Sequence, residues 1–461
     1  MEKILILDCG GIGAEQTATI VREAQVFCEI KPYGISTEEI KTSGYKGVII
    51  TGNAIADKTL YTDKSLFEAG IPVLGIGTGA DILVNALGGK TEPDPNTDGT
   101  VALSLDNTSP LFLGLSPHSL CKMFSGSRIV RIPLGFRISA KSERCPIAAM
   151  ENPRHRLFAV QFRPEDIETF KGDEIIRNFL TRVCNLKGEW IVADYAGKVL
   201  NELKAALGNK SVLCIVDGTI RSIVSALIAQ HAADGKVTCL MINHGLYRKN
   251  EAENIIGLFK TFSDLDFKEL NINQQVLAAL NGITDEEQKI AAVCNTVQQS
   301  LDNALSELGH TDVFVNDGLY LEAKRCINSD KVNCDSVISP LSKLFPNEIN
   351  TVGLTLNMPL ELVERTELPD WGIALRIKGE VSAETVEVLK ECDAVISDTC
   401  STETARLECV LYPQLPFAAN GYTLIVDASP VSDVTAGVAA HRIAETVKKV
   451  GNVFIDTTYR G

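Results

Sequence analysis

The apolar run Lys3-Ile4-Leu5-Ile6-Leu7 (KILIL) sets the pattern for the first part of the chain. GVII at 47–50 and VLGI at 73–76 are runs of the same character, and residues 15–24 (EQTATIVREA) between the first two have amphipathic helical spacing. Short uninterrupted apolar runs are typical of strands buried on both faces of a parallel sheet. Their alternation with helical stretches predicts a doubly wound α/β domain.

A second series of the same kind begins at Ser211 with SVLCIV. It continues with VTCLMI at 237–242 and DVFV at 312–315, and predicts a second doubly wound domain. Residues 185–196 (NLKGEWIVADYA) are predicted to connect the two series.

From about Phe345 the pattern changes to a helix around 382–391 and strands near 422–426 and 453–457. This predicts a third, smaller α+β unit. The predicted fold class is therefore α/β, with two doubly wound parallel-sheet domains and a small α+β domain.

Composition excludes several classes of protein. The 461 residues carry a formal charge of −15, so we expect no nucleic-acid partner. No apolar run reaches eighteen residues, so we expect no membrane span. The thirteen cysteines are scattered without a CxxC pair or a Cys/His cluster. We therefore expect no metal site and a reduced, cytoplasmic protein whose thiols mostly fill the core.

Several motifs resemble those of the glutamine-hydrolysing GMP synthase family, in order and spacing, over nearly the whole chain. They are ILILDCGG, IPVLGIGTGADIL, CPIAAM, FAVQFRPE, VLCIVDGTIRSIVSALI, VTCLMINHGLYRKNEAE, PLSKLF and WGIALRIKGE. The resemblance implies a class I amidotransferase-like domain at 1–188, an ATP-pyrophosphatase-like domain at 189–344 and a dimerisation-like domain at 345–461. Such enzymes make GMP from XMP, ATP and ammonia released from glutamine.

The glutaminase triad of that family is altered at two of its three positions. Its Gly-Ile-Cys-Tyr-Gly motif corresponds to residues 75–79, with Gly77 in place of the cysteine nucleophile. Its His-Pro-Glu corresponds to Arg163-Pro164-Glu165, and an arginine does not act as a base. We expect Arg163 to pair with Glu165. The alternative is that Arg163 provides a cation for a small metabolite.

The phosphate loop of the family, Ser-Gly-Gly-Val-Asp-Ser-Ser, corresponds to residues 217–223 (DGTIRSI). Gly218 and Ser222 are retained, whereas Asp217, Thr219 and Arg221 depart from the family motif. A carboxylate at 217 repels phosphate. Arg221 either pairs with Asp217 across the loop, which we favour, or binds an anion itself.

Other nucleotide motifs also depart from the family. Asn243 replaces the aspartate of Val-Asp-X-Gly, and residues 316–320 (NDGLY) replace Gln-Gly-Thr-Ile-Tyr-Pro-Asp. Residues 329–334 stand where Ser-His-His-Asn-Val-Gly-Gly is expected. Residues 365–372 (RTELPDWG) replace Arg-His-Pro-Phe-Pro-Gly-Pro-Gly.

The apolar runs persist while both sets of polar site residues have changed. We therefore expect a non-catalytic GMP synthase-like protein with a structural, regulatory or ligand-binding role and no required cofactor. We expect a homodimer, with a mixed dimer possible where an active GMP synthase is present. The alternative is a residual enzyme that uses XMP, ATP with Mg²⁺ and free ammonia.

Overall fold

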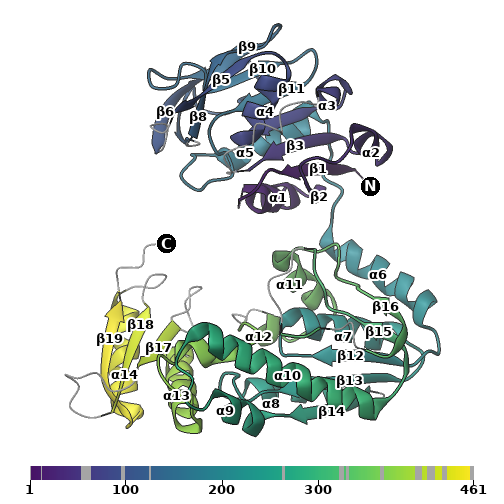
Figure 1. The fold of residues 1–461 in the computed structure, drawn as a ribbon, viewed down its shortest axis with the longest axis vertical. Coiled ribbons are helices and arrows are strands. Elements are labelled where there is room, and N and C mark those ends of the chain that lie inside the picture. The colour runs from purple at the N-terminus through teal and green to yellow at the C-terminus, as the bar shows by residue number, and fades with distance from the viewer. Residues whose placement is uncertain are drawn as a thin grey trace. The chain divides into compact units, whose positions relative to one another are not determined.

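The computed structural model describes most of the chain, as two compact units, 1–191 and 192–461 (Figure 1). The described residues are 2–11, 13–52, 64–94, 99–123, 126–261, 265–320, 326–328, 332–363, 368–399, 408–412, 421–427 and 433–456. No helix among these residues has the length and apolar character needed to cross a membrane.

The first unit is built on a nine-stranded mixed sheet. In sheet order its strands are β2 (Phe27–Pro32), β1 (Lys3–Asp8), β3 (Gly47–Thr51), β4 (Val73–Ile76), β11 (Leu157–Val160), β10 (Ala149–Asn152), β9 (Arg137–Lys141), β6 (Thr100–Leu105) and β7 (His118–Lys122). The strands from β2 to β11 are parallel, and the predicted strands β1, β3 and β4 are confirmed. The antiparallel half from β10 to β7 was not predicted.

Helices cover the parallel half of this sheet, and a separate ribbon forms from two further strands. These elements are α1 (Gly13–Glu23), α2 (Thr37–Thr42), α3 (Ser65–Glu68), α4 (Thr78–Ala86), α5 (Gly172–Asn178), the π-helical turn η2 (Phe179–Val183), β5 (Lys90–Asp94) and β8 (Gly126–Arg131). Leu5 and Leu7 pack with Ile82 of α4 in one cluster. Because alternate strand residues point to opposite faces, Ile4 and Ile6 are buried on the other side of the sheet.

The second unit contains a five-stranded parallel sheet with helices against it. In sheet order its strands are β14 (Leu265–Asn271), β13 (Val237–Asn243), β12 (Val212–Val216), β15 (Thr311–Val315) and β16 (Cys334–Ile338). Its helices are α6 (Val192–Leu207), α7 (Ile220–Ala232), α8 (Glu251–Phe259), α9 (Asn273–Leu280), α10 (Glu286–Leu308), α11 (Pro346–Thr355) and α12 (Leu360–Val363). The strand order reverses between β12 and β15, and ligands of such sheets bind at the carboxyl ends of the strands there.

The C-terminal part of the same unit is a three-stranded sheet with two helices. Its elements are the 3₁₀ turn η4 (Gly372–Arg376), α13 (Ala383–Thr399), β17 (Glu408–Tyr412), β18 (Tyr422–Asp427), α14 (Asp433–Thr446) and β19 (Val450–Asp456). The predicted helix and both predicted strands are present, although residue 457 lies outside the described part. The predicted boundary between 344 and 345 stays a prediction.

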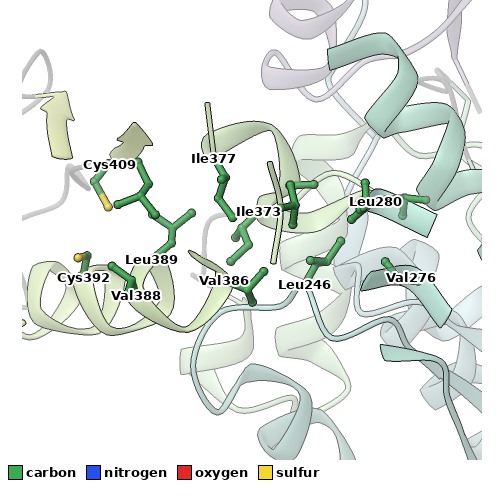
Figure 2. Close-up of a cluster of buried hydrophobic side chains, with 14 of the residues drawn as sticks. Leu246, Val276, Leu280, Ile373, Ile377, Val386, Val388, Leu389, Cys392 and Cys409 are labelled. Carbon is green, nitrogen blue, oxygen red and sulfur yellow. The ribbon is translucent and has the colours of Figure 1, made fainter. Parts of the chain in front are cut away.

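One apolar cluster joins the two parts of the second unit. Figure 2 shows Leu246 and Leu280 beside Ile373, with Leu389 and Cys409 continuing the cluster toward β17. Leu246, Leu280, Ile373 and Leu389 are completely buried. The three-stranded sheet is therefore anchored to the five-stranded sheet by packed side chains.

Cysteine use differs from the sequence prediction at one pair. Most of the described free thiols are buried, as expected. Cys294 on α10, however, forms a disulfide with Cys326. The expectation of a reduced chain did not include this bond, because a separation of 32 residues is not a recognisable spacing.

Candidate functional site

The first candidate site lies where β4 turns into α4. Gly77 occupies this turn with φ 54° and ψ −112°, and its amide donates to the carbonyl of Val160 at the end of the adjacent strand β11. Positive φ is a conformation in which glycine is favoured. The strand–turn–helix of a nucleophile elbow is present, and the position that projects the nucleophile has no side chain.

Close packing explains why both neighbouring glycines are needed. A Cβ atom at Gly79 would lie 1.9 Å from the carbonyl oxygen of Ile50, and one at Gly75 would lie 2.5 Å from the carbonyl oxygen of Gly79. Neither oxygen can move without breaking the sheet or the helix. The backbone of this turn is therefore constrained independently of any catalytic side chain.

Arg163 follows β11 and makes polar contacts through each of its three nitrogens. Its Nε lies 3.3 Å from Glu165 Oε1, Nη1 lies 3.1 Å from Asp166 Oδ2, and Nη2 donates to Gln16 Oε1 at 3.2 Å. The expected pairing of Arg163 with Glu165 is present. Each nitrogen of Arg163 already has one polar contact, so a metabolite would have to share this guanidinium with Glu165, Asp166 and Gln16.

Glu165 is the one family triad side chain that is retained, and it is almost completely buried. Burial raises the pKa of Glu165, while the adjacent Arg163 acts in the opposite direction. Its Oε2 has no hydrogen-bond partner among the described residues. The carboxylate is thus held where an orienting carboxylate would be, and one of its oxygens is unused.

Sequence reasoning missed one buried carboxyl group beside this turn. Asp81 lies in the first turn of α4, donates its amide to the carbonyl of Gly77, and accepts from the hydroxyl of Ser127. Burial raises the pKa of Asp81 to about 6. A carboxyl group four residues after the expected nucleophile, within a mostly apolar helix, was the available signal.

The second candidate site is the loop between β12 and α7. Asp217 Oδ1 accepts from the amide of Thr219 at 3.0 Å and from its hydroxyl at 2.6 Å. The Thr219 hydroxyl accepts from the amide of Ser222 at 3.3 Å and caps α7. A phosphate loop needs free amides directed at the ligand. Here these two amides are satisfied by the side chains of the loop itself.

Arg221 does not pair with Asp217, so the favoured sequence interpretation is wrong. Its Nε lies 3.3 Å from Asp317 Oδ2, and its Nη2 lies 3.3 Å from Asp370 Oδ1. All three side chains are at least 87% buried. The local carboxylate of Asp217 is already bonded to Thr219, whereas Asp317 follows β15 at the point where the strand order reverses.

This three-residue charge cluster joins three motifs that each depart from the family. Arg221 stands at an aspartate position, Asp317 at a glycine of Gln-Gly-Thr, and Asp370 at a glycine of the Pro-Gly-Pro-Gly segment. The altered motifs are evident in the sequence, but the pairing of Asp317 and Asp370 with Arg221 is not. Their opposite charges were the available signal; residues 329–331 and 365–367 lie outside the described part.

Aromatic rings pack on the same loop. A Cβ atom at Gly218, where φ is +89°, would lie 2.4 Å from Tyr247 Cε1. The Tyr247 hydroxyl donates toward the carbonyls of Asp217 and Ile242, both at 2.7 Å. The ring of His244 stacks on Tyr247 at 4.3 Å, and burial lowers the pKa of His244 to about 4. Protein side chains therefore fill the space above the glycine.

Asn243 lies at the end of β13 and contacts the neighbouring strand. Its amide donates to Glu269 Oε1 at 2.8 Å, and its Oδ1 accepts from the amide of Gly245 at 3.2 Å. An aspartate at this position would face Glu269 with like charge. The described residues contain no group of three or more acidic, histidine or cysteine side chains arranged to hold a metal ion.

Comparison with known proteins identifies relatives that cover most of the chain. The class-I glutamine amidotransferase family matches residues 5–183. GMP synthase (glutamine-hydrolysing) of Alkaliphilus metalliredigens is 34% identical over 416 residues, covering 86% of this chain and 81% of the relative. That of Clostridium botulinum strain Kyoto is 33% identical over 415 residues with the same coverage.

A solved glutamine amidotransferase from Thermotoga maritima is 14% identical, with a TM-score of 0.34 over 40% of this chain and 99% of that one. The identity to the full-length relatives extends through both units. The chain belongs to the glutamine-hydrolysing GMP synthase family.

Proposed function

We propose that this chain is a non-catalytic member of the GMP synthase family, with a structural, regulatory or ligand-binding role. The pairing of Arg221 with Asp317 and Asp370 carries the proposal. Loss of the glutaminase alone would leave an enzyme that uses free ammonia. The proposed loss of GMP synthesis itself therefore depends on the changes at the nucleotide site.

The charge cluster supports loss of ATP binding for an electrostatic reason. A polyphosphate at this loop would lie near three carboxylates. Those of Asp317 and Asp370 are buried and paired with Arg221, and the third is that of Asp217. Unit charges 4 Å apart interact by about 4 kcal/mol at the effective dielectric near a protein surface. Displacing the carboxylates would break two buried ion pairs with Arg221, which is costly.

The glutaminase half is proposed to be inactive because it lacks a nucleophile and a base. Gly77 cannot form a thioester, and Arg163 stays protonated. The adjacent Thr78 has no base to activate it. The elbow then serves to fold the sheet, as the close contacts of Gly75 and Gly79 suggest.

Dimerisation through residues from about 345 onward is part of the proposal, as is the three-domain division with an ATP-pyrophosphatase-like fold in 189–344. Phe454 is half exposed on the edge strand β19, which leaves apolar surface for a partner. The partner is a second copy, or an active GMP synthase in a mixed dimer. The proposed location is the cytoplasm, with no bound cofactor.

The decisive experiment is an assay with XMP, ATP, Mg²⁺ and ammonium, which bypasses the glutaminase. Pyrophosphate release and GMP are both measured, with the Alkaliphilus metalliredigens relative as the positive control. We expect both products at the level of a protein-free blank. Release of pyrophosphate that depends on XMP would contradict the proposal and establish the ammonia-dependent enzyme.

Thermal unfolding with single ligands tests binding separately from turnover. A ligand at 100 times its dissociation constant stabilises the folded state by about 2.7 kcal/mol. We expect no shift with ATP and Mg²⁺ or with XMP. A shift with GMP alone would assign the regulatory role to a nucleotide sensor, and a shift with ATP would count against the closed phosphate loop.

A further inference from the structure

The Cys294–Cys326 disulfide is connected to the phosphate loop by a short chain of contacts. Cys294 lies on α10 and is partly exposed, whereas Cys326 is buried with 6% of its surface accessible. The amide of Cys326 donates to Asp370 Oδ2 at 2.7 Å. Asp370 Oδ1 lies 3.3 Å from Arg221 Nη2. One disulfide, one hydrogen bond and one ion pair therefore connect α10 to the β12–α7 loop.

The segment at 326–328 is fixed to one face of α10 at two points. The disulfide is the first, and the second is Gln298, whose Oε1 accepts from the amide of Asn328 at 2.6 Å. Cys294 and Gln298 are four residues apart and so lie on the same helix face. The Gln298 contacts are exposed, so water competes with them. The covalent bond is the firmer of the two attachments.

We propose that the Cys294–Cys326 disulfide is a redox-controlled latch that holds Asp370 against Arg221. While the bond is intact, both oxygens of Asp370 are engaged, one by Arg221 and the other by the Cys326 amide. Breaking the bond frees Cys326 to leave α10 and removes that amide from Asp370. Arg221 then loses the firm hold of one of its two carboxylates.

The chemical step is thiol–disulfide exchange with a dithiol reductant. A thiolate of the dithiol attacks Sγ of Cys294, the more exposed of the two residues, and the Sγ–Sγ bond breaks with Cys326 leaving as a thiolate. The second thiol of the dithiol resolves the mixed disulfide. The dithiol becomes a disulfide, and its two protons end on the two cysteines. This proposal goes beyond the loss of catalysis, and its test measures no activity.

The experiment measures how fast phenylglyoxal, which modifies free guanidinium groups, labels Arg221. Labelling is followed by peptide mass spectrometry before and after reduction with dithiothreitol, and non-reduced peptides establish whether the cross-link is present. Arg376 is an internal reference, because its side chain is also 13% exposed and is paired with a carboxylate, that of Asp393.

We expect reduction to raise the labelling rate of Arg221 about fivefold or more, as local opening becomes easier, and to leave Arg376 unchanged. In Cys294→Ser, Arg221 should label at the fast rate with or without dithiothreitol. Cys334→Ser, which removes a partly exposed free thiol, should keep the redox difference. Absence of the cross-linked peptide, or equal Arg221 labelling in both redox states, would overturn the proposal.

Discussion

In the function proposed above, the two candidate sites of this chain differ from the family motifs in opposite ways. At the β4–α4 turn the backbone has the geometry of an elbow, and the proposal assigns a missing thiol to Gly77 and a missing base to position 163. At the β12–α7 loop there are charged side chains that the family motifs lack, and Arg221 forms ion pairs with Asp317 and Asp370. We call the first an emptied site, because it lacks functional side chains, and the second a filled site, because paired charged side chains occupy it.

This difference has a physical consequence for reversibility. An emptied site on an intact backbone needs only its missing groups returned. A filled site contains buried charges that interact with one another, so each single reversal breaks a buried ion pair. We therefore expect the glutaminase half to regain activity more readily than the nucleotide half.

The largest expected effect is on glutamine hydrolysis by Gly77→Cys/Arg163→His. The thiol returns to the elbow, and the imidazole is placed beside the unused oxygen of Glu165. Because residues of a triad act as a unit, we expect the double variant to exceed the unaltered chain by about 100-fold. Glutamate release from glutamine is the measurement.

Each single variant is the control for this revival. Gly77→Cys has a nucleophile but no base, and Arg163→His has a base but no nucleophile, so both should stay at background. If the double variant folds and also stays at background, the elbow has lost more than two side chains. The distinction between an emptied and a filled site would then fail.

The next largest expected effect is a loss of stability in the variant Arg221→Leu, which removes the ion pairs of Arg221 with Asp317 and Asp370. This removes the cation that is paired with two buried carboxylates, those of Asp317 and Asp370, so the free energy of unfolding of the second unit should fall by about 3 to 5 kcal/mol. Trp371 lies beside Asp370 and reports this unit in urea unfolding, in a Trp190→Phe background that silences the first unit.

The triple variant Arg221→Leu/Asp317→Asn/Asp370→Asn separates charge from packing. It removes the carboxylates together with the arginine, so we expect it to be more stable than Arg221→Leu alone. Arg163→Leu is the comparison in the first unit, where Glu165 can be protonated because its pKa is already raised. Equal losses for Arg163→Leu and Arg221→Leu would contradict the contrast between the sites.

A somewhat smaller effect is expected from reducing the disulfide, and only in the second unit. A cross-link between residues 32 apart stabilises a protein by about 3 to 4 kcal/mol through the entropy of the unfolded chain. Urea unfolding with and without dithiothreitol should show this loss in the Trp371 signal. The Trp190 signal, read in a Trp371→Phe background, should not change.

The fold was predictable where strands are buried on both faces. Runs such as 3–7 and 73–76 are almost wholly apolar, as strands buried on both faces of a parallel sheet require, and a side chain at Gly75 or Gly79 would collide with backbone atoms. The antiparallel strands of the first unit were missed. β6, for example, alternates exposed and buried residues and contains polar positions, so it does not stand out from loops.

The individual residues of the candidate sites could be predicted from the sequence, but the long-range pairs that they form could not. Gly77 and the Arg163–Glu165 contact follow from local sequence, since the two partners are two residues apart. Arg221 is 96 residues from Asp317 and 149 from Asp370, as the numbering gives and the hydrogen bond to Asp370 records. Only the tertiary arrangement at the reversal of strand order brings these groups together, so Asp217 was the wrong choice.

The smallest of the four expected effects is a pH dependence of the free energy of unfolding. It tests whether water is excluded from the β12–α7 loop. Burial lowers the pKa of His244 to about 4 from 6.5, so the folded state binds fewer protons than the unfolded state between these values. This contribution to stability is present above pH 6.5 and is lost as the pH falls toward 4. From pH 7 to pH 5 the loss should be about 2 kcal/mol.

His244→Gln is the matched variant, because it keeps a polar side chain of similar size and does not titrate. The free energy of unfolding of the unaltered chain minus that of His244→Gln should be about 2 kcal/mol lower at pH 5 than at pH 7. A difference that does not vary with pH would mean that water reaches His244. The space above Gly218 would then be open to a ligand, and the phosphate loop would be an emptied site like the elbow.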